Sequence, residues 1–266
     1  MSTSFIYDTP QLAATYERVS AHQQFADGKQ LISALEISRG EHVLDIGAGT
    51  GRLAAYVARL VGPSGWVVGI DPLPHRIEIA RSRATSNFQP RVGRAEDLSE
   101  FPDASFDTVY LNSVFHWIKS KARALAEILR VLKADGRLGF SCQDADHPHE
   151  ALHFLQCAVT EAGVESDLYA PGLSSPELEA LVTRAGFVGY KHELRTFVSF
   201  YPDADALLAS ISSSSFGNFL VNVSEGGRAR LRDALDRLLE PRRIAREGIR
   251  LERYVAFAMA RRPIKD

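Results

Sequence analysis

Cysteine is scarce in this chain, since Cys142 and Cys157 are the only two among 266 residues. Two cysteines cannot build a disulfide scaffold, and such sparing use is typical of a reducing compartment. The first residues have neither the basic segment nor the apolar core of a secretory signal. No stretch approaches the roughly 18 unbroken apolar residues of a membrane span. We therefore expect a cytoplasmic protein without a membrane partner.

An excess of charge of one sign is also missing, because 31 basic residues face 33 acidic ones and the net charge is −2. Nucleic-acid binding needs a basic excess or a basic stripe, so no nucleic-acid partner is expected. The arginines between 242 and 253 alternate with glutamates; we interpret them as a solvated face, with recognition of an acidic group as the alternative. The eight histidines show no metal-ligand spacing, so we predict no metal.

Short apolar strands alternate with helical segments between residues 40 and 142. The strands are expected at 42–46, 66–70, 91–93, 106–111 and 137–141, with helices after the first, the second and the fourth. This rhythm indicates right-handed crossovers and an α/β fold with a doubly wound, mostly parallel sheet. A ligand then binds outside the carboxyl ends of the strands, where the strand order reverses.

The flanking segments differ from this cofactor-binding core, residues 40–142. Residues 1–38 are predicted to form a helical cap, with one helical region over 10–38. Helical inserts are expected at 143–173 and 203–240, and strands at 188–201 and about 251–261. We treat residues 1–266 as a single domain, expected to be monomeric, with the inserts on the substrate side.

A glycine-rich turn follows the first strand, in the order Asp45, Gly47, Ala48, Gly49 and Gly51. The glycines allow close approach of the backbone to a ligand. The carboxylate of Asp45 would repel a pyrophosphate and attract a cationic amino-acid group. Arg52 also stands where the dinucleotide pattern needs a small residue. These features favour a cationic nucleotide and argue against a nicotinamide-dependent oxidoreductase.

The next two strand ends carry further candidate cofactor contacts. Asp71 is placed to accept hydrogen bonds from both hydroxyls of a ribose, with an ordinary helix cap as the alternative. Pro72 and Arg76 follow it at the start of the next helix. The loop after the third strand is predicted to hold an adenine through the backbone of Ala95 and the carboxylates of Glu96 and Asp97, the alternative being a plain polar loop.

The end of the fourth strand should face the reactive end of the ligand. Asn112 and Ser113 are predicted cofactor contacts there, and Phe115, His116 and Trp117 are predicted to face the substrate. His116 could act as a general base or be structural. Cys142, at the end of the fifth strand, could reach the cleft or be a small buried apolar residue.

Five segments resemble, in order, the motifs of class I S-adenosylmethionine-dependent methyltransferases: 43–52, 69–72, 94–98, 106–110 and 129–138. Within this class they resemble in particular the group that holds ubiquinone-biosynthesis and sterol methyltransferases. The resemblance covers roughly 40–142 and the last strand. It implies a seven-stranded sheet with an antiparallel last strand, and S-adenosylmethionine as cofactor, leaving as S-adenosylhomocysteine. It also implies that Asp45 and the three glycines contact the amino-acid part, and Asp71 the ribose. Arg94 departs from the family, which often has an acidic residue there.

The opening segment 7–20 and the chain length are similar to fungal S-methyltransferases of secondary metabolism, including the gliotoxin bis-thiomethyltransferase. This likeness implies S-methylation of a dithiol metabolite. The alternatives are O- or C-methylation of a small aromatic, quinol or polyketide-type acceptor, and a non-catalytic cofactor-binding module. The acceptor pocket is predicted to be apolar and lined by aromatic residues: Tyr7, Tyr16, Phe25, Phe115, His116, Trp117 and Phe154.

Overall fold

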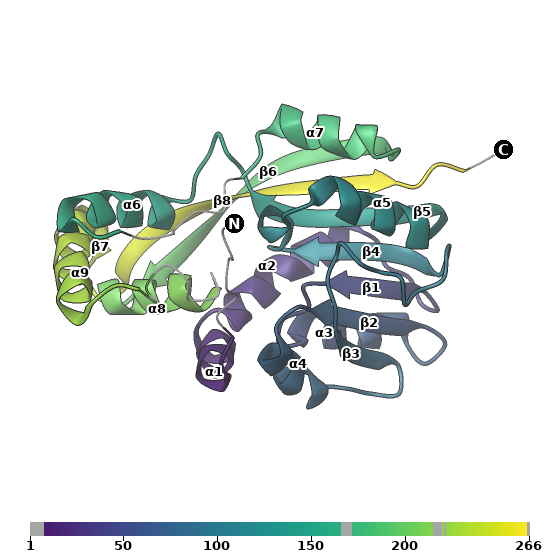
Figure 1. Cartoon of the computed structure of the whole chain (residues 1–266), viewed down its shortest axis with the longest axis horizontal. Helices are drawn as coiled ribbons and strands as arrows, with labels where there is room; N and C mark the ends of the chain where they lie inside the picture. Colours follow the sequence, from purple (N-terminus) through teal and green to yellow (C-terminus); the bar gives the residue numbers. More distant parts are fainter. Residues whose placement is uncertain (1–7, 166–171, 215–219, 221, 265–266) are drawn as a thin grey trace.

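A twisted, mostly parallel sheet forms the centre of the computed structural model, which describes residues 8–165, 172–214, 220 and 222–264 (Figure 1). The strand order is β3-β2-β1-β4-β5-β8-β6, and a short β7 pairs with β8. The strands are β1 His42–Ile46, β2 Trp66–Asp71, β3 Phe88–Val92, β4 Phe106–Asn112, β5 Leu132–Gln143, β6 Val188–Tyr201, β7 Arg243–Ile244 and β8 Gly248–Arg261.

The strand directions confirm the predicted α/β class. Neighbouring strands from β3 to β5 are parallel, whereas β8 is antiparallel to both β5 and β6. Seven strands follow the expected path and the two-residue β7 adds an eighth to the described sheet. Because the order reverses at β1, the carboxyl ends of β2, β1 and β4 meet at one edge, where ligands bind in such folds.

Helices lie on both faces of the sheet. The described helices and 3₁₀ turns are α1 Pro10–Val19, α2 Ala21–Ala34, α3 Arg52–Val61, α4 Pro74–Arg81, η1 Phe115–Trp117, α5 Lys121–Val131, α6 Glu150–Ala162, α7 Ser175–Arg184, α8 Ala204–Ser214, α9 Glu225–Leu239 and η3 Glu240–Arg242. The helical region expected at 10–38 is divided at Ser20, whose buried hydroxyl contacts the Ser210 carbonyl at 3.2 Å. No helix in the described ranges is long and apolar enough to cross a membrane.

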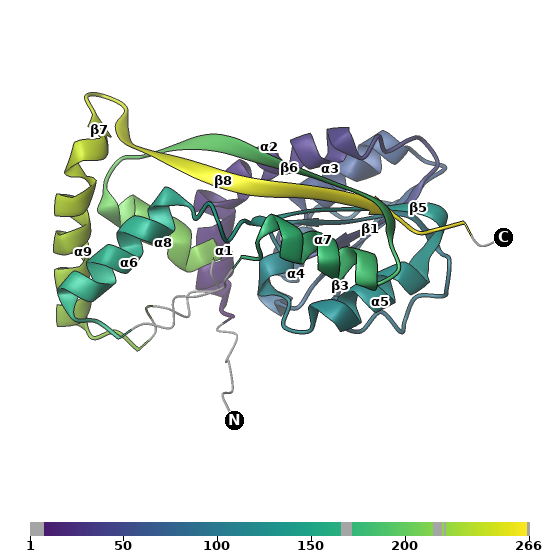
Figure 2. The same cartoon turned by 90° about the horizontal axis from the view of Figure 1, so that it is seen from above.

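Three hydrophobic clusters hold these layers together. One lies between the sheet and helices α5 and α7, and a second between the sheet and helices α2 and α3. The third joins α6, α8 and α9 to the far ends of β6 and β8, which run out of the sheet as 14-residue strands (Figure 2). The two predicted inserts therefore come together in one helical lobe.

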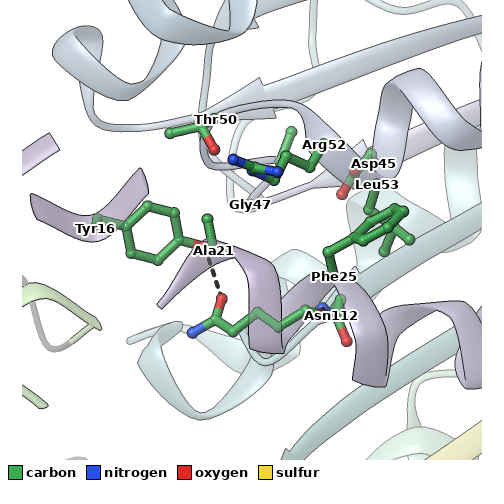
Figure 3. A pocket seen from close by; sticks show the side chains of 11 residues that line it. Tyr16, Ala21, Phe25, Asp45, Gly47, Thr50, Arg52, Leu53 and Asn112 are labelled. Atoms are coloured by element: carbon green, nitrogen blue, oxygen red, sulfur yellow. Dashed lines mark hydrogen bonds between the residues drawn. The ribbon is translucent and has the colours of Figure 1, made fainter. Parts of the chain in front are cut away.

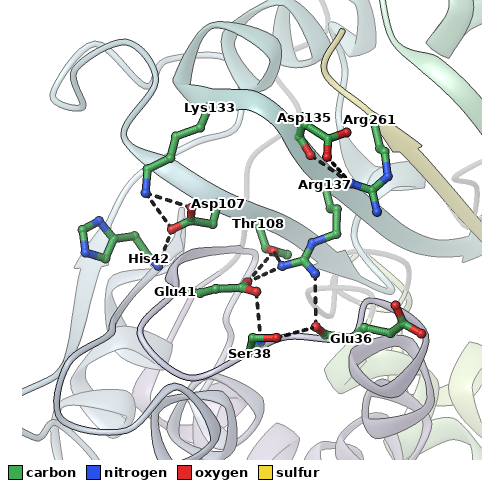
Figure 4. A network of polar contacts seen from close by, with 10 residues as sticks. All are labelled: Glu36, Ser38, Glu41, His42, Asp107, Thr108, Lys133, Asp135, Arg137 and Arg261. Carbon is green, nitrogen blue, oxygen red and sulfur yellow. Dashed lines mark hydrogen bonds and ion pairs between the residues drawn. The ribbon is translucent and has the colours of Figure 1, made fainter. Parts of the chain in front are cut away.

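Charged residues link the strands at the amino-terminal edge of the sheet (Figure 4). Arg137 of β5 pairs with Glu41, which accepts a 2.9 Å hydrogen bond from Thr108 of β4. Asp107 binds the ammonium of Lys133 and the backbone N–H of His42, each at 2.8 Å. Since this edge is opposite the glycine-rich turn, the network organises the sheet and leaves the ligand edge to other residues.

Two strands differ from their predicted bounds. β3 begins at Phe88, earlier than expected, and mixes exposed polar positions with Pro90, so its sequence lacks a strong alternation. In β5 the regular pairing with β4 starts at Arg137, as predicted, but Leu132 already pairs with Phe106. The residues between bulge out around Asp135, which has a φ of 58°.

Candidate functional site

The glycine-rich turn leaves β1 and enters α3 through three positive φ angles, 79° at Gly47, 55° at Gly49 and 78° at Gly51. Such angles are costly for residues with a β-carbon. The turn is fixed to the neighbouring strand because the N–H groups of Gly47 and Ala48 donate to the Ile70 carbonyl at 2.7 and 2.9 Å. A β-carbon at Gly47 would lie 2.2 Å from Val114 Cγ2. Glycine at this position is therefore a packing requirement as well as a conformational one.

Asp71 connects the end of β2 to this turn. One carboxylate oxygen accepts a hydrogen bond from the N–H of Gly49 and the other from the N–H of Leu73, both at 2.9 Å. The side chain is buried, with 3% of its surface exposed. Each oxygen keeps a second lone pair for a ligand hydroxyl. The alternative of an ordinary helix cap does not apply, because Leu73 is the N-cap residue of α4 and that helix has no side-chain capping bond.

Asp45 is the other buried carboxylate, and its Oδ2 accepts a 2.7 Å hydrogen bond from the Tyr110 hydroxyl. Burial raises the pKa of Asp45 to about 7, against the lowering effect of the Tyr110 hydrogen bond, and the Asp71 charge raises it further. Burial also raises the pKa of Asp71, while the Arg76 guanidinium lowers it. Two buried carboxylates beside one glycine turn form an electronegative site suited to a cationic ligand.

A narrow cleft opens between the turn and the amino-terminal helices (Figure 3). Its lining comprises Tyr16, Ala21, Gln24, Phe25, Asp45, Gly47, Ala48, Thr50, Arg52, Leu53 and Asn112. Tyr16 reaches over Gly49 and donates a 2.7 Å hydrogen bond to Gln24. α1 and α2 thus form a roof over the turn.

Two curated relatives resemble the chain beyond the turn. The demethylmenaquinone methyltransferase of Symbiobacterium thermophilum is 36% identical over 125 residues, which are 45% of this chain and 49% of that protein. The ubiquinone/menaquinone biosynthesis C-methyltransferase UbiE of Cronobacter sakazakii is 29% identical over 196 residues, 72% of each chain. The chain spans about half the length of the first of these relatives.

Solved structures share the fold at low identity. The YcgJ protein of Bacillus subtilis has a TM-score of 0.63 and 20% identity, over 92% of this chain and 100% of that one. Phosphoethanolamine N-methyltransferase 2 of Haemonchus contortus, solved with S-adenosylhomocysteine, has a TM-score of 0.61 and 17% identity. The match covers 96% of this chain and 58% of that one. The family described as "Methyltransferase domain" matches residues 44–140. This matched segment contains the glycine-rich turn and the strand ends that carry Asp71 and Asn112.

The loop after β3 carries the predicted adenine contacts. Ala95 is buried, with 4% of its surface exposed. Glu96 is half-buried, and its Oε2 lies 4.0 Å from Nε of Arg94. Asp97 is exposed and accepts hydrogen bonds from the backbone and hydroxyl of Ser99. Ala95 and Glu96 therefore remain candidate adenine contacts, while the Asp97 carboxylate is engaged in its own turn.

At the end of β4, Asn112 is joined to the roof formed by α1 and α2. The Asn112 amide donates to the Gln24 carbonyl at 2.9 Å, and its oxygen accepts from Ser141 at 3.0 Å. Ser113 has a φ of 59° and donates its N–H to the Ser141 hydroxyl at 2.9 Å. Asn112 lines the cleft as predicted, whereas Ser113 is the strained link into η1.

The three residues of η1 occupy different surroundings. Phe115 is fully buried and stacks on Phe140 with ring centroids 4.3 Å apart, so it belongs to the core and does not line the cleft. His116 is buried against the ring of Trp117, 5.0 Å between centroids. Burial lowers the pKa of His116 to about 3, and the neighbouring His149 and Lys121 lower it further. A neutral imidazole of such low basicity is a poor general base.

The remaining predicted acceptor residues are divided between the roof and the helical lobe. Tyr16 and Phe25 line the cleft, and Arg76 stacks over the Tyr16 ring at 4.0 Å. Phe154 packs in the helical lobe, with Arg242 over its ring at 5.8 Å. Tyr7 lies outside the described residues.

Other features of the site are not apparent from the sequence. Gln24, Thr50 and Leu53 line the cleft, although no motif singles out Gln24 in its helix. Burial raises the pKa of the Cys142 thiol to about 12, so Cys142 matches its alternative as a small buried residue. The described residues contain no group of three or more histidine, cysteine, aspartate or glutamate side chains that could hold a metal ion.

Proposed function

We propose that this protein transfers a methyl group from S-adenosylmethionine to a small-molecule acceptor. The observation that carries the proposal is the buried Asp45 carboxylate beside the glycine-rich turn, both of which line the cleft. This site matches a cationic amino-acid nucleotide in charge and shape. The methyltransferase family match over residues 44–140 supports the same conclusion.

The residues present fit the cofactor in separate ways. Asp45 and the glycine turn would hold the charged amino-acid part, Asp71 the ribose hydroxyls, and the backbone at Ala95 the adenine. Bound S-adenosylmethionine supplies a methyl group already activated on its sulfonium. The chain then has to hold the acceptor in line with that methyl group. Such positioning can lower the activation barrier by about 7–11 kcal/mol. Tyr16 and Gln24 close the roof and exclude water.

The acceptor side is proposed to lie between the roof and the helical lobe, where the predicted cap 1–38 and inserts 143–173 and 203–240 converge. The finer prediction is S-methylation of a dithiol metabolite. This reaction requires little help from the protein, because a thiol ionises near neutral pH. O- or C-methylation of a quinol-type acceptor requires hydrogen-bonding groups near the acceptor oxygen. The two relatives described above carry names of quinone-pathway methyltransferases.

Calorimetry with S-adenosylhomocysteine tests the proposal. We expect a dissociation constant in the micromolar range, and no heat at high micromolar ligand would refute it. Mass spectrometry should then show an increase of about one methyl group when the protein and S-adenosylmethionine meet dithiol, phenol and quinol probes. Binding without any transfer would favour the non-catalytic alternative.

The raised pKa of Asp45 predicts a pH-dependent affinity. The ionised carboxylate attracts the cofactor and the protonated one does not, so affinity for S-adenosylhomocysteine should fall about tenfold from pH 8 to pH 6. The pKa of Asp45 is higher in the folded chain than in the unfolded chain. The free energy of unfolding of the ligand-free protein should therefore fall as the pH rises towards 7 and Asp45 ionises.

Titration calorimetry at several pH values provides the measurement. Asp45→Asn should bind more weakly and lose most of the pH dependence. Tyr110→Phe should move the midpoint to higher pH, since it removes the hydroxyl that donates to Asp45. Equal affinities of the unmodified protein at pH 6 and pH 8 would contradict this assignment.

A further inference from the structure

The two outer strands of the sheet differ in how their open edges are protected. β3 is five residues long and carries Pro90 at its centre, and both features discourage pairing with another chain. β6 is the outer strand on the other side, and among the described residues it pairs with β8 alone. It spans 14 residues without proline, and its register with β8 is unbroken from Lys191 to Tyr201. Its outer row of backbone N–H and C=O groups is therefore a template for a further strand.

The layers that flank β6 lie against its faces and leave this edge open. α7 lies on one face, where the Ser175 hydroxyl contacts His192 Nδ1 at 2.8 Å. The helical lobe lies on the other face, where Tyr201 packs into its apolar cluster. On the same face as His192, Val198 is 42% and Phe200 48% exposed. Large apolar side chains this exposed beside an unpaired edge favour coverage by another protein.

The charged residues of β6 form a self-complementary pattern. Lys191, Glu193 and Arg195 alternate along one face of the strand. Glu193 is 58% exposed, whereas Arg195 is held by a 2.8 Å ion pair with Glu193 and lies 4.7 Å from the ring centre of Phe257. When a second copy of β6 pairs antiparallel with its centre at Leu194, each Glu193 lies opposite the Arg195 of the other copy. Opposite charges at directly facing positions stabilise such a pair of strands.

The same residues disfavour the neighbouring registers. A twofold axis perpendicular to the joint sheet keeps each face continuous, so the centre of pairing falls on a residue. A centre at Glu193 would place Glu193 opposite itself and Lys191 opposite Arg195. A centre at Arg195 would place that guanidinium opposite its own copy. Since like charges at facing positions are destabilising, the charges select the Leu194 register over its two neighbours.

We propose that this protein forms a twofold-symmetric dimer, in place of the expected monomer, in which the β6 strands of two copies pair antiparallel about Leu194. The inference goes beyond the proposed function and does not depend on it. The joint sheet places Val198 and Phe200 of each copy beside the start of the other β6, where Val188 is 49% exposed. Because the paired strands are antiparallel, the two clefts beside the glycine-rich turns lie at opposite edges of the joint sheet, and each is built from one chain.

Complementary charge variants test the pairing. Sedimentation velocity over a range of concentrations should show the unmodified protein at twice the mass of the chain. Glu193→Arg and Arg195→Glu each place like charges at both facing positions, so each should raise the dissociation constant of the dimer by at least about tenfold. An equimolar mixture of the two variants should recover the dimer, because every facing pair then joins opposite charges. Glu78→Arg makes the same charge change at an exposed position of α4 and should leave the dimer unchanged.

The inference is overturned by a monomer at every concentration, or by a dimer that either single variant leaves intact. It is also overturned by a mixture that stays monomeric although both variants keep the circular dichroism of the unmodified protein. Hydrogen–deuterium exchange of the unmodified protein decides the matter where a variant fails to fold. Backbone N–H groups from Lys191 to Val198 should exchange more slowly at high than at low protein concentration, whereas those of β3 should not change. Exchange in β6 that is independent of concentration would contradict the dimer.

Discussion

Replacing Asp71 with alanine should weaken S-adenosylhomocysteine binding by about a hundredfold or more. The carboxylate would lose two charge-assisted hydrogen bonds to the ribose, each contributing about 1.5–3 kcal/mol. The Gly49 N–H would also lose its acceptor, so the glycine turn would be less well ordered before the ligand arrives. Titration calorimetry measures the effect.

Two other variants separate these contributions. Asp71→Asn keeps one oxygen and the side-chain shape, and should bind with an affinity between that of the alanine variant and that of the unmodified protein. Asp103→Ala removes a carboxylate that is 74% exposed and pairs with Arg130, so its affinity should be unchanged. A full-affinity Asp71→Ala protein would show that the ribose is held elsewhere.

Gly47→Ala should lower the free energy of unfolding by about 2–5 kcal/mol. A left-handed backbone conformation costs a residue with a β-carbon about 1–2 kcal/mol, and overpacking adds about 1–3 kcal/mol. The overpacking arises because the new carbon would lie 2.2 Å from Val114 Cγ2. Chemical denaturation measures the change, and the same clash should displace the turn and abolish cofactor binding.

Gly163 offers a matched control within the chain. It has a φ of 59°, and a β-carbon added there would meet nothing within 4 Å. Gly163→Ala should therefore report the conformational cost alone, and the excess at Gly47 should report the clash. Val114→Ala, combined with Gly47→Ala, should recover that excess. Equal losses at the two glycines would rule out the clash.

Much of the fold follows from the sequence because local signals and burial agree. β1, β2 and β4 are largely apolar on both faces, as buried parallel strands are. β2 and β4 end at Asp71 and Asn112, and Asp45 is the penultimate residue of β1. β3 is less predictable because Gln89, Pro90 and Arg91 interrupt its apolar character at an outer strand of the sheet. The early start of β5 depends on a bulge opposite β4, a tertiary feature without a local signal.

The candidate site was predictable where one turn contains its residues. Asp45 and the glycines are consecutive, and Asp71 ends the adjacent strand, so topology alone brings them together. Phe115 illustrates the limit, because it stacks on Phe140 in the core and does not line the cleft. The roof contact of Gln24 with Asn112 likewise depends on how distant segments pack.

The long strands β6 and β8 determine how far the helical lobe lies from the parallel part of the sheet. β5 pairs with residues 255–261 of β8, so before Val255 the strands β6 and β8 form a two-stranded ribbon that carries the lobe. A strand advances about 3.4 Å per residue, and its side chains alternate between the two faces. Adding two residues to each strand would therefore move the lobe outward by about 7 Å and keep the same faces of the ribbon turned towards it.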